Sequence, residues 1–182
     1  MGFHNSDNGH AEHWGCVIFC RCDNGSLCGF AEVSGSLVRD RQYPCLVSET
    51  LRGGGTTASY RLLDDGSISV VNSCLTDSED VLTSQGRAFV EDTQTNAKLL
   101  VSFVNLKDTW LFPGNYWVLG LGENYEYAVV GEPTREYGWI LSRSCTLSSE
   151  NLAEVIDILT AQGYDISQFI LTDQSSFGCT PE

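Results

Sequence analysis

Bulky apolar side chains recur at every second position in several short segments of this chain. Ala58, Tyr60 and Leu62, for example, alternate with Ser59 and Arg61. Side chains of a β-strand switch faces at each residue, so this alternation predicts strands with one apolar face. Seven strands are predicted in this way, and a segment around residues 37–42 adds an eighth. The seven are residues 56–63, 67–72, 85–92, 96–104, 116–121, 125–131 and 137–143.

A helical period follows the last of these strands. Its apolar positions fall on one face of an amphipathic helix, namely Leu152, Val155, Ile156 and Leu159. Ser148 or Ser149 can cap its start, and Gly163 can end it. Residues 169–171 then predict a short terminal strand.

Short strands at even spacing, joined by turns such as Asp64-Asp65-Gly66, are typical of antiparallel sheets. Residues 117–119 are apolar on both faces, which is expected where a helix covers the outside of a closed sheet. The sequence therefore predicts an all-β fold, an antiparallel sandwich or barrel, and an eight-stranded antiparallel up-and-down β-barrel with one C-terminal α-helix packed outside would explain the doubly apolar strand. Residues 1–34 lack a steady period and are expected to form a Cys-rich, poorly ordered extension, with residues 35–182 as the barrel domain.

The charge of the chain limits its partners. It carries 24 acidic and 10 basic residues, a net charge of -14. This balance argues against nucleic acid, and also against electrostatic docking on an anionic membrane. No apolar run reaches about 18 residues, so we expect no transmembrane segment. Membrane association of another kind stays open, and so does the choice between a monomer and a homodimer.

Cysteine usage points to an oxidising compartment with disulfides, because 8 cysteines are many for a chain of 182 residues. No signal peptide is visible at the start of this sequence. We therefore expect a secreted or membrane-associated protein, with the cytoplasm as the open alternative. The roles of Cys16, Cys20, Cys22 and Cys28 stay open. Their spacing fits no paired C-x-x-C zinc pattern, so no metal is expected.

An eight-stranded barrel is wide enough to be filled by its own side chains or to hold one small ligand. Aromatic rings with polar tips suit a pocket for an apolar ligand with a polar head. Periodicity alone favours the plainer interpretation, in which these rings pack as an ordinary core. The aromatic candidates for the interior are Tyr60, Phe103, Tyr116, Tyr137 and Trp139.

Four segments resemble the lipocalin family. Residues 137–143, Tyr-Gly-Trp-Ile-Leu-Ser-Arg, followed by the capped helix, resemble the last barrel strand, and the family's lone Arg falls on Arg143. Residues 65–74 resemble the second hairpin, residues 97–103 the fifth strand, and residues 163–170 the segment after the helix. The similarity covers residues 56–175 and is strongest to bacterial outer-membrane and apolipoprotein D-like lipocalins.

The chain departs from the family pattern near its start. The motif Gly-x-Trp of the first strand is best matched at Gly35-Ser36-Leu37, where the Trp is missing. Arg143 then lacks the ring that it stacks on in the family, and Trp14 is a substitute only if the extension folds back. The resemblance implies structural roles for Gly35 and Arg143.

The resemblance also implies a calyx that carries a small hydrophobic molecule, such as a fatty acid, lysophospholipid, sterol or pigment, with no cofactor. It implies a disulfide between Cys179 and Cys74, with Cys45 as the alternative partner. The ligand-binding wall implied by strand parity is Tyr60, Ile68, Val70, Asn72, Leu99, Val101, Phe103, Tyr116, Val118, Tyr137 and Trp139.

No set of nucleophile, base and orienting residue is visible in the sequence, so we expect no enzyme and assign no catalytic residue. Two alternatives remain. One is a lipocalin-related enzyme that acts on an oxidised lipid or a carotenoid. The other is a module whose Cys-rich residues 10–28 bind a metal or a partner.

Overall fold

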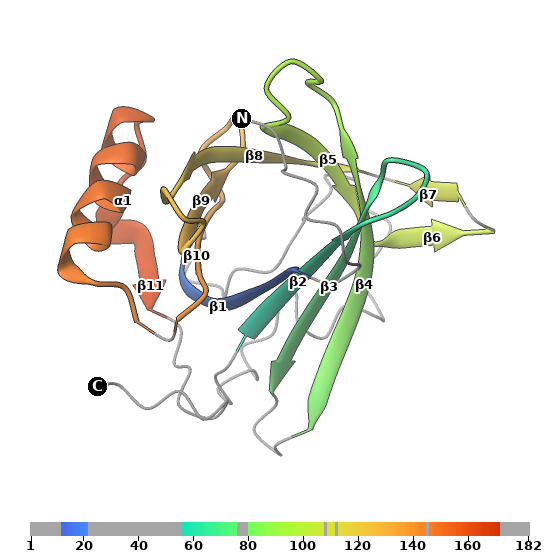
Figure 1. Cartoon of the computed structure of the whole chain (residues 1–182), viewed down its shortest axis with the longest axis horizontal. Coiled ribbons are helices and arrows are strands. Elements are labelled where there is room, and N and C mark those ends of the chain that lie inside the picture. Colours follow the sequence, from blue (N-terminus) through green and yellow to red (C-terminus); the bar gives the residue numbers. More distant parts are fainter. Residues whose placement is uncertain are drawn as a thin grey trace.

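The computed structural model describes residues 12–21, 56–75, 80–107, 109–111, 113–144 and 146–171. This part of the chain is mostly antiparallel β-structure with one α-helix (Figure 1). The elements are β1 (Glu12–Arg21), β2 (Thr56–Leu62), β3 (Ile68–Leu75), β4 (Val81–Val90), β5 (Lys98–Ser102), β6 (Val104–Leu106), β7 (Thr109–Leu111), β8 (Gly114–Leu121), β9 (Tyr127–Gly131), β10 (Gly138–Ser142), α1 (Ser149–Ala161), a 3-10 turn (Ile166–Gln168) and β11 (Phe169–Leu171).

The main sheet closes on itself. Its strand order is β10-β9-β8-β5-β4-β3-β2-β1-β11, and β1 also pairs with β10. Cys16 lies opposite Ser142 of β10, while Trp14 lies opposite Ala58 of β2. Figure 1 shows the strands as a ring, with α1 beside β9 and β10 on its outside. The predicted antiparallel barrel with one external helix is thus confirmed, and β11 adds a further strand beside β1.

The predicted strands between residues 56 and 143 are present, with ends shifted by a few residues. The largest shift is at β4, which begins at Val81 rather than at residue 85. The sequence analysis missed β1, which lies in the segment expected to form loops. It also missed the separate β6–β7 hairpin. Residues 37–42 lie outside the described residues, so the domain boundary at 34/35 stays a prediction.

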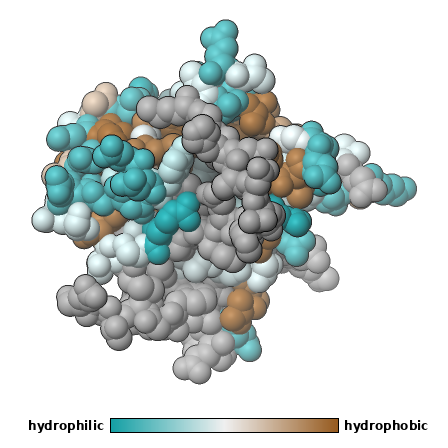
Figure 2. All heavy atoms as spheres, viewed as in Figure 1, coloured by the Kyte–Doolittle hydropathy of each residue, from teal (hydrophilic) through white to brown (hydrophobic). Residues whose placement is uncertain are grey.

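Apolar side chains form two layers. One fills the barrel interior, and the other lies between the sheet and α1. In β9, Val130 faces the interior while Val129 packs under α1, and both are fully buried. This double burial explains why the strands beside the helix are apolar on both faces. On the face that Figure 2 shows, the hydrophobic residues among the coloured ones form small separate areas.

The helix begins and ends as its sequence predicts. The Ser148 side chain accepts a hydrogen bond from the backbone N–H of Asn151, 3.1 Å away, and is the N-cap. Gln162 is the C-cap, and Gly163 follows with a φ of 80°, a left-handed conformation that favours glycine. Val155 and Leu159 are the fully buried residues of its inner face.

Candidate functional site

The barrel interior contains a cavity with an apolar wall. The volume of this cavity is about 70 Å³, and the empty space is about 580 Å³ when the open solvent at its mouth is included. None of the described residues that line it carries a charged side chain. They are Tyr60, Ile68, Ala88, Leu99, Val101, Tyr116, Val118, Leu121, Tyr125, Ala128, Val130 and Leu141.

The cavity lies toward the end of the barrel where strands are joined by tight turns. Ile68 begins β3 directly after one turn, and Leu121 ends β8 directly before another. Tyr125 belongs to that second turn, has a φ of 58° and packs against the interior layer. Arg143 ties the end of β10 to the same turn, because its Nε donates to the carbonyl of Tyr125 at 2.8 Å.

A bulge in β8 decides which residues of this strand face the cavity. Tyr116 and Val118 face inward in simple alternation, but the pairing with β9 shifts between Val118 and Gly120. Leu121 therefore faces the cavity, although strict alternation from Val118 would turn it outward. Gly120 lies beneath α1, where an added Cβ would meet the side chain of Ile158 at 2.6 Å.

Six of the eleven residues predicted for the ligand-binding wall line the cavity, and these are Tyr60, Ile68, Leu99, Val101, Tyr116 and Val118. Four others pack in the same interior layer without lining the cavity: Val70, Phe103, Tyr137 and Trp139. The ring of Phe103 occupies the space over Gly86, and Tyr137 stacks on Trp139 with centroids 6.4 Å apart. The eleventh, Asn72, is buried on the inner face of β3.

The sequence analysis missed six lining residues: Ala88, Leu121, Tyr125, Ala128, Val130 and Leu141. Leu141 and Val130 alternate correctly with their neighbours, so parity could have found both. Ala88 and Ala128 have small side chains, so the alternation of bulky residues does not indicate them, although a cavity forms where side chains are small.

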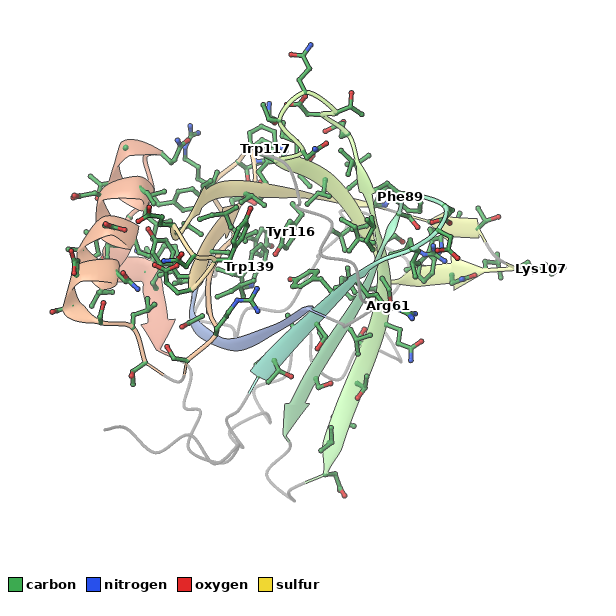
Figure 3. The ribbon with its side chains drawn as sticks, viewed as in Figure 1. Arg61, Phe89, Lys107, Tyr116, Trp117 and Trp139 are labelled. Carbon is green, nitrogen blue, oxygen red and sulfur yellow. The ribbon has the colours of Figure 1, made fainter. Side chains whose placement is uncertain are left out.

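Two tyrosines from distant strands meet inside the barrel. The hydroxyls of Tyr60 in β2 and Tyr116 in β8 are 2.9 Å apart and share a hydrogen bond. Burial raises the pKa of Tyr60 to about 12, an effect that the bond to Tyr116 partly offsets. Burial also raises the pKa of Tyr116 well above its ordinary value, and the neighbouring Tyr60 adds to this shift. Both phenols are therefore neutral at physiological pH, and Figure 3 shows Tyr116 inside the ring of strands.

Asn72 is the other polar group of this wall. It shares the inner face of β3 with Ile68 and Val70, and its exposed fraction is 6%. Its Oδ1 has no hydrogen-bond partner within the described structure. Buried acceptors are normally satisfied, so an unpaired carbonyl oxygen at this depth needs an explanation.

Other expected sites lie mostly outside the described residues. These include Gly35, Cys45, Cys179 and the side chains of Cys16, Cys20, Cys22, Cys28, Trp14 and Cys74. Within the described ranges, no group of three or more His, Cys, Asp or Glu side chains could hold a metal ion. No helix in those ranges is long and apolar enough to cross a membrane.

Comparison with known proteins agrees with this architecture. The model of the lipocalin-like domain family matches residues 43–174. Outer membrane lipoprotein Blc of Escherichia coli K12 is 38% identical over 119 residues, 65% of this chain and 64% of that protein. Apolipoprotein D of Mus musculus is 32% identical over 133 residues, 69% of this chain and 67% of that protein. The chain thus spans less than two thirds of the length of the bacterial relative.

The structural comparison supports the same fold. H1 crustacyanin from the lobster Homarus americanus superposes with a TM-score of 0.59 at 13% identity, covering 93% of this chain and 79% of that one. The resemblance read from the strand and helix motifs is confirmed by the family match and by the relatives. The chain belongs to the lipocalin family.

Proposed function

We propose that this protein binds and carries, or buffers, a small hydrophobic molecule inside its barrel. The candidate classes are fatty acids, lysophospholipids, sterols and pigments. The observation that carries the proposal is the cavity at the tight-turn end of the barrel, whose described lining residues are apolar or neutral. Each methylene group buried there would contribute about 0.8 kcal/mol, so a chain of roughly twelve carbons would bind with micromolar affinity after association costs.

The size of the cavity favours a chain over fused rings. Its volume is about 70 Å³. An apolar cavity of about 150 Å³ holds benzene, so half that volume suits a single file of methylene groups. The remainder of the ligand would lie in the mouth.

Membership of the lipocalin family supports a carrier rather than an enzyme. The metal-binding module of residues 10–28 stays an open alternative, because its side chains lie outside the described ones. We further propose that the protein is secreted or membrane-associated. This location agrees with the cysteine content and with a relative named outer membrane lipoprotein.

A titration with the neutral dye Nile red tests the proposal. Trp139 lies in the interior layer, so energy transfer from this residue to the dye reports occupancy. We expect saturable binding with a dissociation constant in the micromolar range and a loss of that transfer in Trp139→Phe. Native mass spectrometry with lipid extraction would identify a co-purified guest. The absence of saturable binding by any apolar probe would contradict the proposal.

A further inference from the structure

The described residues that line the cavity are uncharged, but polar side chains lie at the level of Val70 to Asn72 on the inner face of the sheet. These are the hydroxyls of Tyr60 and Tyr116 and the side-chain amide of Asn72. No described Lys or Arg lines the cavity, so an anion placed there would meet no cation from those residues. These hydroxyl and amide groups therefore influence which polar end group of a ligand the barrel accepts.

Tyr60 and Asn72 are close neighbours on adjacent strands. In the pairing of β2 with β3, Tyr60 lies opposite Val70 and Ala58 lies opposite Asn72. Tyr60 and Asn72 thus occupy a diagonal on one face of the sheet, where side chains about 7–8 Å apart at the backbone can reach a common partner. One ligand group between them can contact both.

Asn72 offers an acceptor that the described structure leaves unused. Its Oδ1 is buried and unpaired, and Ser84, directly opposite in β4, does not bond to it. The hydroxyl of Tyr60 is engaged by Tyr116, yet a hydroxyl has one donor and two acceptor positions, so Tyr60 can make a further bond. A guest that brings an O–H group would satisfy Asn72 and bond to Tyr60 at once.

The depth of this level also fits a chain with a polar end. Ile68 lines the deep cavity, and Asn72 follows four residues later on the same face of β3, about 13 Å along the strand. Asn72 itself does not line the cavity, and a hydrocarbon chain that extends about 13 Å from Ile68 toward the mouth would place its end group beside it. An ionised carboxylate at that level would lose its hydration without gaining a counter-ion from the lining residues that the structure describes.

We propose that Asn72 and Tyr60 form a recognition site for a lipid alcohol, so that the barrel prefers a long-chain neutral hydroxyl compound over the corresponding fatty-acid anion. This inference rests on the proposed function, because it requires the ligand to lie inside the barrel. It narrows the ligand from any hydrophobic molecule to one with a neutral hydrogen-bond donor at the end of its chain.

Competition with Nile red on the full chain at about pH 8 tests the preference. The competitors are dodecanol, dodecyl methyl ether and dodecanoate, which share one chain length and differ only in the end group. We expect dodecanol to bind about tenfold more tightly than the ether and the anion, since one satisfied buried acceptor corresponds to about this factor.

Variants assign the preference to the two residues. Asn72→Leu and Tyr60→Phe should each reduce the ratio between the affinities for dodecanol and for the ether to about twofold or less. Ser73→Ala is the matched control, because Ser73 adjoins Asn72 on the opposite face and bonds to Thr83 at the exposed surface. Circular dichroism verifies that each variant is folded. If Asn72→Leu does not fold, Tyr60→Phe still tests the preference, because it keeps the aromatic ring and removes only the hydroxyl.

Equal affinity for dodecanol and dodecanoate would overturn this inference, as would a preference that persists in both variants. If Nile red and the ether still bind in that case, the proposed function stands and only the recognition site fails. If neither the dye nor any of the three compounds binds, the proposed function fails and this inference fails with it.

Discussion

The hydroxyl of Tyr127 in β9 donates a hydrogen bond to Oε2 of Glu154 in α1, and the two oxygens are 2.7 Å apart. This bond joins the outer face of the barrel to the helix at the level of Val155, which is fully buried. The ring of Tyr127 is buried with it in the layer between sheet and helix. The contact therefore couples the position of the helix to the strand whose other face lines the cavity.

Removal of the Tyr127 hydroxyl should destabilise the packing of α1 against the barrel. We expect Tyr127→Phe to lower the free energy of unfolding by about 1 kcal/mol, because a hydrogen bond to a charged group is lost while the ring is kept. Urea unfolding measures the change. Glu154→Gln is the control, since its amide oxygen can still accept the bond and should preserve most of the stability. Equal losses in both variants would mean that the charge, rather than the bond, carries the effect.

Alkaline pH should weaken the same contact. Burial, followed by the bond to Glu154 and its negative charge, raises the pKa of Tyr127 to about 12. An unfolded tyrosine titrates near 10, so the folded state holds this proton more tightly. The resulting stability is fully present below about pH 10 and is lost as the pH rises toward about 12. We expect urea unfolding of the unmodified protein to depend more steeply on pH in this window than that of Tyr127→Phe, and parallel slopes would contradict the assignment.

Gly131 permits the segment after the helix to approach the sheet. An added Cβ would collide with the hydroxyl of Tyr164 and lie 2.8 Å from a methyl group of Leu119. The same hydroxyl accepts a hydrogen bond from the backbone N–H of Glu132 at 3.0 Å. We expect Gly131→Ala to lower the melting temperature and to cost about 1–3 kcal/mol, as overpacking does.

Gly114 provides the matched control for that change. It is also a strand glycine, but a Cβ there would meet only the carbonyl of Val101, at 4.0 Å. Gly114→Ala should therefore change the melting temperature little. An equal loss in both variants would show that the close approach of Tyr164 is not the cause.

Filling the cavity should weaken ligand binding while the protein stays folded. Ala88 lines the cavity and is almost fully buried, so Ala88→Leu would place new methyl groups in the space for a guest. We expect the affinity for Nile red to fall about tenfold or more, while the protein stays folded. Phe89→Leu is the control, because Phe89 is the next residue of β4 and points outward (Figure 3). An unchanged affinity in Ala88→Leu would place the dye elsewhere.

The disulfide between Cys74 and Cys179 stays a prediction, since neither side chain lies among the described ones. Cys74 is near the end of β3, opposite Leu82 of β4. A bridge closing a loop of about a hundred residues would stabilise the protein by roughly 3–5 kcal/mol. Peptide mapping without reduction should recover the linked pair, and Cys74→Ser should lower stability only under oxidising conditions. Recovery of Cys179 linked to Cys45 would select the alternative.

Much of the barrel could be predicted because its strands carry their signal locally. In β2 and β3, the alternation of side chains and the turn at Asp65-Gly66 are both readable in a window of a few residues. In contrast, β1 contains a continuous apolar run, Val17-Ile18-Phe19, among Gly, His and Cys. Such a run has no alternating pattern, and its partners lie far away in the sequence, so local reasoning could not place it.

The lining of the cavity was harder to predict than the fold. Strand parity predicts inward side chains at Leu99 and Val101, and both line the cavity because β5 pairs regularly with both neighbours. It did not place Leu121, since the bulge in β8 depends on the pairing of two strands and leaves no mark in one sequence. The cavity itself exists because residues such as Ala128 have small side chains. The periodicity of the sequence does not show where such a space will form.

The pairing of β1 with β10 also has a consequence for biosynthesis. At the seam of the barrel, Cys16 of β1 pairs with Ser142 of β10, and the two residues lie far apart in the sequence. β11, which also pairs with β1, is synthesised after β10. Hairpins from β2 to β5 can form as the nascent polypeptide emerges, but the seam must wait until the last strands leave the ribosome. Until then the sheet has two unpaired edge strands, and unpaired edges promote aggregation. Ribosome stalling shortly before the last barrel strand would therefore be especially harmful.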